Sequence, residues 1–275
     1  MTLQPRRRAF LLRRSTVEDY VTTRFDCSAE EAAKFEKKNA GRASSVDRAE
    51  DSCDKLQQRL DLSEAELKKI VLRLPSGLSF SDEANLEPTL AALQKRLDLN
   101  EAELKKIMMK QPQVLCCSYE SNLEPKLALL QRRLNLSEAE HKKIVLGFPP
   151  VLSCSYEKNL KPTLTALQKR LDLSEAELKK IVLGKPSVLG VSYEKNLEPK
   201  LAFLQEELQL SKEALRENIV KMPQLLSYSL EKRYRPRVKQ CREANKPVVL
   251  VLKRASLTNE KFEQLLARRH QQREK

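Results

Sequence analysis

The chain has 275 residues, and its 52 lysines and arginines against 38 aspartates and glutamates give a net charge of +14 at pH 7. Such an excess of positive charge indicates a polyanionic partner, although it predicts no particular fold. Only five glycines and two histidines occur, and the sequence has neither a phosphate-cradling glycine pattern nor a cluster of serine, histidine and acid. We therefore expect no catalysis and no cofactor, and the lack of a long apolar run predicts no membrane partner.

The first 17 residues predict a targeting segment. They contain five arginines, no acidic residue and the apolar group Phe10-Leu11-Leu12, a composition typical of mitochondrial and plastid transit peptides. We expect a mitochondrial protein, with the chloroplast as the alternative. A basic tail on a cytosolic protein is the other interpretation of this composition.

Residues 18–50 are polar and show no sustained period, which indicates a linker or a frayed cap. From residue 51 onward a period of 37 residues governs the sequence. Proline recurs at this interval in two registers, at Pro88, Pro125, Pro162 and Pro199 and at Pro75, Pro112, Pro149, Pro186 and Pro223. A period of this length predicts a solenoid of stacked supersecondary units.

Each repeat carries the signals of two helices. The first helix has a leucine stripe on one face, as in Leu123, Leu127, Leu130 and Leu134. Its proline stands in the first turn, where a missing amide donor costs nothing. Ser137 and Glu140 then form a capping box that begins the second helix, and Pro149 ends it. The four or five residues that follow suit a short 3-10 turn.

We predict an all-α fold, a right-handed helical-repeat solenoid (superhelix) of about five 37-residue repeats in one continuous domain at 51–270. No unit can bury its apolar stripe alone, so neighbouring units must stack. The expected repeats are 51–87, 88–124, 125–161, 162–198 and 199–235, followed by a C-terminal cap at 236–270.

The order of motifs in one repeat resembles the mitochondrial transcription termination factor (mTERF) family. A Pro-x-Val-Leu turn precedes Ser-Tyr-Glu-x-Asn-Leu-x-Pro-x-Leu, a leucine-rich helix and Leu-x-Leu-Ser-x-x-x-Leu, and the stretch from Met222 to Arg237 resembles the C-terminal end of that family. The resemblance covers residues 53–270. It implies an organellar protein whose superhelical groove holds duplex DNA between basic side chains.

Other polar side chains are interpreted as structural. The six cysteines show no Cys-x-x-Cys spacing, and Cys117 and Cys154 share a repeat position with Val191, so we expect small core residues rather than metal ligands. His141 replaces a leucine of the second helix and is expected to be a packed or half-exposed residue rather than a catalyst. The repeated tyrosines are read as packing between repeats rather than as base-stacking platforms, because aromatic residues make up only 5% of the chain; they are Tyr119, Tyr156 and Tyr193.

Each second helix carries a lysine pair: Lys68/Lys69, Lys105/Lys106, Lys142/Lys143 and Lys179/Lys180. The first lysine follows a glutamate by four residues, which favours a pair on the surface of one helix. The residue four positions before the second lysine is an alanine, so the second lysine is either a solvated residue or a phosphate contact. The candidate contacts are Lys69, Lys106, Lys143 and Lys180. A second possible ridge, Lys95/Arg96, Arg132/Arg133 and Lys169/Arg170, is broken by Glu206/Glu207.

The most basic stretch lies near the C-terminus, at Lys232, Arg233, Arg235, Arg237, Lys239, Arg242 and Lys246. Arginine forks suit phosphate and base-edge contacts. The family resemblance implies DNA contacts at Arg233, Arg235 and Arg237, where the motif matches. A weaker match extends the implied contacts to Lys239 and Arg242.

We predict a monomeric, non-enzymatic protein that binds double-stranded DNA and regulates organellar transcription, including its termination. The first alternative is a factor that binds structured RNA for intron splicing or ribosome assembly. The second is a protein-binding scaffold with an incidental basic end. No metal or cofactor is expected in any of these.

Overall fold

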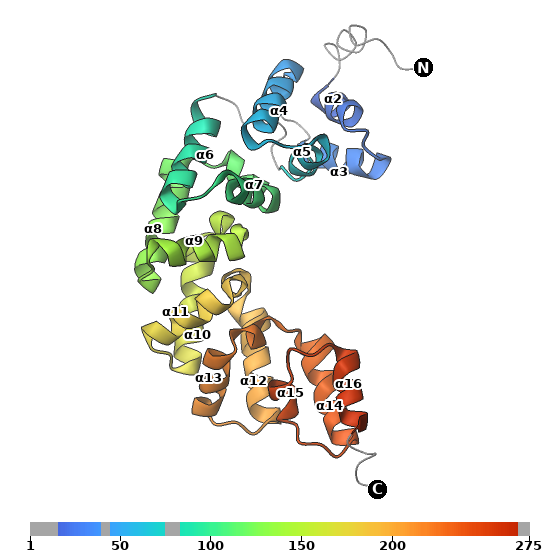
Figure 1. Ribbon diagram of the computed structural model, residues 1–275, viewed down its shortest axis with the longest axis vertical. Helices are drawn as coiled ribbons and strands as arrows, with labels where there is room; N and C mark the ends of the chain where they lie inside the picture. The colour runs from blue at the N-terminus through green and yellow to red at the C-terminus, as the bar shows by residue number, and fades with distance from the viewer. Residues whose placement is uncertain (1–15, 40–44, 75–82, 269–275) are drawn as a thin grey trace. The chain divides into compact units, whose positions relative to one another are not determined.

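The computed structural model describes residues 16–39, 45–74 and 83–268 (Figure 1). Throughout these ranges the chain forms α-helices joined by short 3-10 and π turns, and none of them contains a β-strand. The predicted all-α helical-repeat solenoid is therefore confirmed. The chain divides into two compact units between Leu129 and Leu130, inside helix α8 (Glu124–Leu134), and each unit is described by itself.

The first unit contains α2 (Val17–Arg24), α3 (Ala29–Asn39), α4 (Val46–Leu60), α5 (Glu64–Val71), α6 (Glu83–Leu97), α7 (Glu101–Lys110), the 3-10 turn η1 (Pro112–Cys116) and the π turn η2 (Tyr119–Leu123). The second unit contains α9 (Glu138–Gly147), η3 (Pro149–Ser153), η4 (Tyr156–Leu160), α10 (Lys161–Leu171), α11 (Glu175–Gly184), η5 (Pro186–Gly190), η6 (Tyr193–Leu197), α12 (Glu198–Glu207), α13 (Lys212–Lys221), η7 (Pro223–Ser227), η8 (Leu230–Tyr234), α14 (Arg235–Glu243), α15 (Leu250–Lys253) and α16 (Asn259–Arg268).

Each first helix of a repeat ends at a residue in the left-handed conformation. These residues have φ between 47° and 53° and recur every 37 residues, at Asp61, Asp98, Asn135, Asp172 and Gln209. The amide of Leu62 donates to the carbonyl of Gln57 (2.9 Å), which is the hydrogen bond of a Schellman motif. The leucine of that motif is buried in four repeats, as Leu62, Leu99, Leu136 and Leu173. The Leu-x-Leu pattern of the sequence is thus a helix stop with its apolar contact.

The second helix begins as predicted. Capping boxes with both hydrogen bonds occur at Ser63/Glu66, Asn100/Glu103, Ser137/Glu140 and Ser174/Glu177. The proline that follows opens the short 3-10 turn, as Pro112, Pro149, Pro186 and Pro223. These parts of the repeat are therefore confirmed.

A five-residue π turn precedes each first helix from η2 onward, and the sequence did not predict it. In η2 the hydroxyl of Ser118 accepts from the amide of Ser121 (3.3 Å), while the amide of Leu123 reaches back to the Ser118 carbonyl (3.2 Å). The last residue of each such turn is fully buried, namely Leu123, Leu160, Leu197 and Tyr234. The wide turn therefore brings an apolar side chain into the core one residue before the proline-containing helical turn begins.

Three of the first lysines, Lys68, Lys105 and Lys179, tie their repeats to the preceding ones. Lys105 Nζ lies 3.0 Å from Glu66 and donates to the Asp61 carbonyl (2.6 Å). The same arrangement, which we call the inter-repeat clamp, joins Lys68 to Glu31 and Asp26, Lys179 to Glu140 and Asn135, and Arg216 to Glu177 and Asp172. The structural role was predicted, but the predicted partner is wrong: Glu101, four residues before Lys105, accepts instead from Arg59 (2.7 Å).

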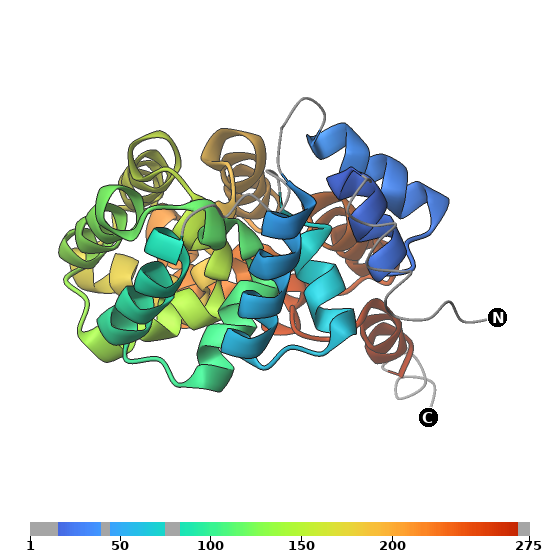
Figure 2. The same cartoon turned by 90° about the horizontal axis from the view of Figure 1, so that it is seen from above.

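The segment 18–50, expected as a linker or a frayed cap, contains most of α2, all of α3 and the start of α4. Thr16 and Asp19 make a capping box, and Tyr20 and Val21 are buried. Helix α2 packs against α3 and α4 (Figure 2). The predicted transit segment at 1–17 lies outside the described residues up to position 15, and Val17 already belongs to α2.

Close packing between repeats predicts the effect of one substitution. A Cβ atom on Gly190 would overlap the ring of Phe148, whereas Ser227 occupies the position of Gly190 one repeat later. We expect Gly190→Ser to lower the free energy of unfolding by about 1–3 kcal/mol, because the ring must move. The measurement is urea unfolding. In a Phe148→Met background the same change should cost less, and an equal cost in both backgrounds would contradict the overlap.

Candidate nucleic-acid interface

The second lysine of each pair is exposed, as predicted. Lys69 and Lys106 lie on α5 and α7 of the first unit, and Lys143 and Lys180 lie on α9 and α11 of the second. No carboxylate of the described residues lies within ion-pair distance of any of the four. The residue four positions earlier is in each case an exposed alanine. These cations can therefore meet a phosphate without first giving up a protein partner.

The exposed face of α14 carries three of the predicted cations. Arg235, Lys239 and Arg242 are exposed and stand at i, i+4 and i+7, which is one stripe of a helix. Each is paired with a glutamate: Arg235 with Glu231 (3.0 Å), Lys239 with Glu243 (3.7 Å) and Arg242 with Glu207. Exposed ion pairs of this kind contribute little and exchange readily. The stripe is accessible but, unlike the four lysines, already partnered.

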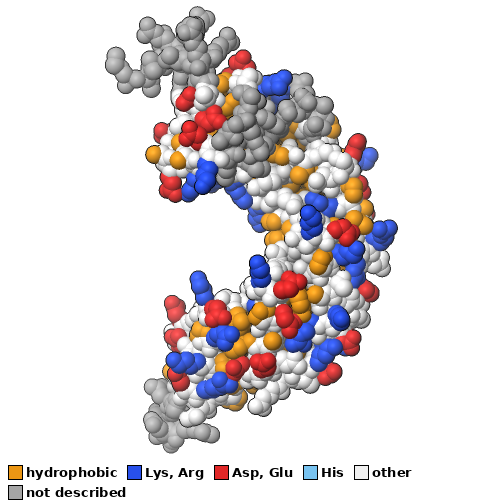
Figure 3. Space-filling model, turned by 180° about the vertical axis from the view of Figure 1, so that it is seen from behind, with side chains coloured by type: hydrophobic (Ala, Val, Ile, Leu, Met, Phe, Trp, Pro, Cys, Tyr) orange, Lys and Arg blue, Asp and Glu red, His pale blue; other side chains and the backbone are white. Residues whose placement is uncertain are grey.

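Acidic and basic side chains alternate over the face of the molecule shown in Figure 3. The net positive charge therefore does not by itself mark out an interface. Pairing and exposure distinguish the candidate contacts from the other cations.

The prediction of a DNA contact at Arg237 is wrong. Its side chain is 1% exposed, and its guanidinium donates to the carbonyls of Arg254 (3.2 Å) and Leu257 (2.5 Å) and to Asn259 Oδ1 (3.1 Å). It also lies 4.6 Å above the ring of Phe262. Burial lowers the pKa of Arg237. This arginine fastens α14 to the connection between α15 and α16, which lie beside it in Figure 1.

Arg233 is half-buried and also has structural partners. It donates to the carbonyl of Ala255 (2.9 Å) and lies 4.3 Å above the ring of Tyr228. A guanidinium held in this way offers little to a nucleic acid. Of the three arginines implied by the family resemblance, only Arg235 is therefore exposed.

A repeat register that the sequence contains, but that we did not use, explains the burial of Arg237. Counting back by 37 residues leads to Lys200, Thr163, Lys126 and Thr89, of which Lys200, Thr163 and Thr89 are buried as well and Lys126 is half-buried. Thr163 donates to the Val191 carbonyl (3.5 Å), and Lys200 Nζ donates to the Leu226 carbonyl (2.5 Å) and to Asn196 Oδ1 (2.9 Å). The side chains of Thr163, Lys200 and Arg237 therefore donate to backbone carbonyls of the segment that follows. Burial lowers the pKa of Lys200 to about 8.

The arginines of the second predicted ridge are also structural. Arg96 contacts Glu124 (3.2 Å), and Arg170 contacts Glu198 (3.1 Å) and Gln205 (2.8 Å). Arg133 likewise donates to Glu175 and Gln168. Only the preceding residue of each pair remains exposed, as Lys95, Arg132 and Lys169.

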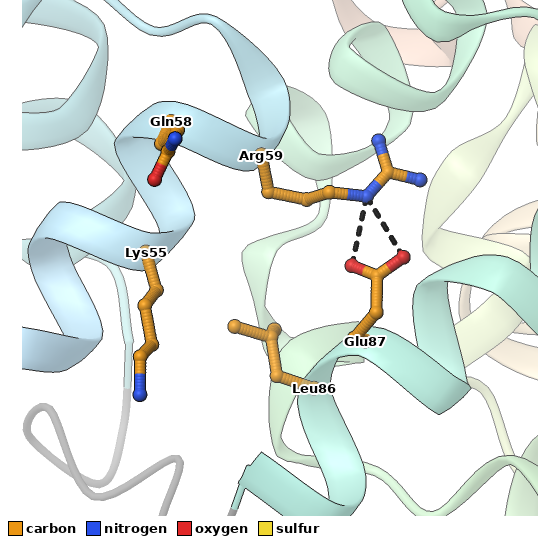
Figure 4. A pocket seen from close by; sticks show the side chains of 5 residues that line it. All are labelled: Lys55, Gln58, Arg59, Leu86 and Glu87. Carbon is orange, nitrogen blue, oxygen red and sulfur yellow. Dashed lines mark hydrogen bonds and ion pairs between the residues drawn. The ribbon is translucent and has the colours of Figure 1, made fainter.

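Arg59 makes the same kind of contact between neighbouring repeats in the first unit. It reaches from α4 to Glu87 of α6 (2.8 Å), beside a cavity of about 460 Å³ that is lined by Lys55, Gln58 and Leu86 (Figure 4). Arg59 also donates to Glu101 and Gln94. The cavity thus borders a structural contact between neighbouring repeats.

The other residues interpreted as structural fit only in part. His141 is fully buried, but Cys117 and Cys154, predicted as core residues, are half-buried. The hydroxyl of Tyr119 donates to Glu124 of its own repeat (2.5 Å). Among the residues that the structure describes, no group of three or more histidine, cysteine, aspartate and glutamate side chains could hold a metal ion. None of the described helices is long and apolar enough to span a membrane.

The different environments of Arg235 and Arg237 predict different effects on stability. Arg237→Ala should lower the free energy of unfolding by about 3 kcal/mol or more, because several buried carbonyls lose their donor. Arg235→Ala, on the exposed stripe, should change it by less than about 0.5 kcal/mol. Denaturant unfolding of both variants checks this, and equal stabilities would contradict the buried position of Arg237.

Lys200 predicts a dependence of stability on pH. Its pKa in the folded chain is about 8, below the ordinary 10.5, so between these values the unfolded chain binds a proton that the folded chain has lost. Stability relative to Lys200→Thr should therefore rise with pH across this window, by up to about 3 kcal/mol. Threonine is the residue at the equivalent positions 89 and 163. Unfolding of both proteins from pH 7 to 10 measures the difference, and parallel curves would contradict the lowered pKa.

Comparison with known proteins gives a family. The mTERF family model matches residues 50–172 and 164–263, and a comparison with curated protein sequences finds no match. Proteins of the mTERF family are helical-repeat, nucleic-acid-binding proteins of mitochondria or chloroplasts. Since the two matches together span well over half of the sequence, the chain belongs to the mTERF family.

Proposed function

We propose that the chain binds double-stranded DNA and regulates organellar transcription, including its termination, without catalysing a reaction. The observation that carries this proposal is the lysine at one position of successive second helices, which is exposed and has no ion-pair partner among the residues that the structure describes. In the first unit these are Lys69 and Lys106, and in the second Lys143 and Lys180. Within each unit, cations at the same position of successive second helices suit the regular spacing of phosphates along a nucleic acid.

The exposed stripe of α14 forms the second part of the proposed interface. In the second unit the lysine series ends at α13, where Glu217 takes the position that follows Lys180. Beyond this exposed glutamate, Arg235, Lys239 and Arg242 again offer cations. Binding there requires a phosphate to replace a carboxylate, which makes this part weaker per cation than the lysines.

The proposed protein is a monomer that is directed to the mitochondrion by its arginine-rich first residues, with the chloroplast as the alternative. Cleavage of such a leader at residue 17 would remove the Thr16 cap and the buried side chain of Val17 from α2. We therefore place the end of the leader before Thr16.

Structured RNA is the second candidate partner, since A-form and B-form backbones both attract such lysines. Nothing in the geometry of the lysines favours RNA over duplex DNA. A protein-binding scaffold is the third hypothesis. It predicts no salt-dependent binding to either nucleic acid.

A salt titration with charge-matched variants tests the proposal. We expect Lys143→Ala/Lys180→Ala to weaken binding of the chain to labelled duplex DNA and to reduce the slope of log K against log salt by about 2, since two phosphate contacts are lost. The control is Lys158→Ala/Lys195→Ala, which removes the same charge from exposed lysines of η4 and η6. Equal losses in both variants would refute a contact at the second helices.

The same titration with structured RNA separates the candidates. Tighter binding to duplex DNA supports transcription regulation, whereas tighter binding to RNA would move the protein to splicing or ribosome assembly. Weak binding to both, without a salt dependence, would leave only the scaffold.

A further inference from the structure

Residues 16–39 have the anatomy of a repeat, although the period of 37 does not reveal it. Asp26 has φ of 46° at the end of α2, like Asp61 at the end of α4. The amide of Ser28 donates to Glu31 (3.0 Å), and the amide of Glu31 donates to the Ser28 hydroxyl (3.3 Å), which is a capping box at the start of α3. These features precede those of the next repeat by 35 residues, and the family model matches only from residue 50.

The contacts of this segment with the next repeat are those of a stacked repeat. Lys68 makes the inter-repeat clamp with Glu31 (2.9 Å) and the Asp26 carbonyl (3.3 Å). Arg24 donates to Gln57 (3.1 Å) and Glu64 (3.2 Å). One period later Arg59 donates to Gln94 (3.0 Å) and Glu101 (2.7 Å), which are the equivalent residues. The segment is therefore the first repeat of the array.

The register of this repeat assigns a place to Lys34. An offset of 35 residues puts Phe35 at the position of Ile70, and both are buried, at 1% and 0% exposed. The same offset puts Lys34 at the position of Lys69, the exposed lysine of the second helix. Lys34 is itself exposed on α3.

One difference separates Lys34 from the other lysines of the series. Glu30, four residues earlier, lies 2.6 Å from Lys34 Nζ, where the later repeats have alanine. The two side chains are 69% and 78% exposed, so the pair is weak and open to exchange with a phosphate.

We propose that the repeat at 16–39 extends the nucleic-acid interface, that Lys34 contacts a phosphate of duplex DNA, and that Glu30 weakens this contact. The inference rests on the proposed function, because it adds one member to the series of lysines that the function uses. It goes beyond the matched region, since it assigns binding to residues before position 50.

The test compares single variants of the full chain with labelled duplex DNA across a salt titration. Lys34→Ala should reduce the salt slope by about 1, as Lys69→Ala does. Glu30→Ala should raise the affinity at low salt, because it frees Lys34, and the double variant should bind like Lys34→Ala alone. Lys37→Ala, an exposed lysine of α3 outside the register, is the matched control and should bind like the wild type.

If Lys69→Ala weakens binding while Lys34→Ala does not, the first repeat lies outside the interface and this inference falls. An equal loss in Lys34→Ala and Lys37→Ala would overturn it as well, since general charge would then explain the effect. If the wild type shows no salt-dependent binding at all, the proposed function falls together with it.

Discussion

The inter-repeat clamp is the interaction on which the stacking of repeats depends. A left-handed residue ends each first helix and leaves its carbonyl facing outward, and the cation from the next repeat fills that place, as Lys105 does at Asp61. The same cation contacts the capping-box glutamate, here Glu66. The backbone and side-chain hydrogen bonds of Glu66 lower its pKa to about 2. One side chain thus donates to the carbonyl at the end of one helix and neutralises the capping glutamate at the start of another. The clamp also forms where the interval is 35 instead of 37, from Lys68 to Glu31 and Asp26, so it tolerates a change of two residues in this spacing.

The clamp also decides which cations remain for a partner. Lys68, Lys105 and Lys179 and the arginines at the ends of the first helices are engaged in contacts between repeats. The second lysine points away from these contacts and stays exposed. The chain has a net charge of +14, yet only a subset of its cations is available, so its interface follows from the architecture of the repeat rather than from the net charge.

The sequence was sufficient where the cause is local and insufficient where stacking chooses between partners. A capping box such as Ser137/Glu140 and a leucine stripe need only their own segment, and both were predicted correctly. Whether Lys105 meets Glu101 of its own helix or Glu66 of the previous repeat depends on how the repeats stack. The signal for Arg237 was present in the register with Thr163 and Lys200, but a run of arginines resembles a binding surface more than a buried position. The first repeat was missed because its interval is 35 and because Cys27 and Ala32 replace leucines of the pattern.

The end of the array shows how far the pattern of contacts can vary while its geometry persists. In the regular repeats an arginine at the end of the first helix donates to a glutamine 35 residues later, as Arg170 does to Gln205. At the next step Glu207 stands at the arginine position and Arg242 at the glutamine position, so the donor and acceptor have exchanged places. The contact survives, but its cation now lies on the exposed stripe of α14. Arg242 therefore owes its place to packing first, and any contact that it makes with a phosphate competes with Glu207. A side chain can belong to both the scaffold and the interface, and the balance between its two partners then sets how strongly the C-terminal stripe binds.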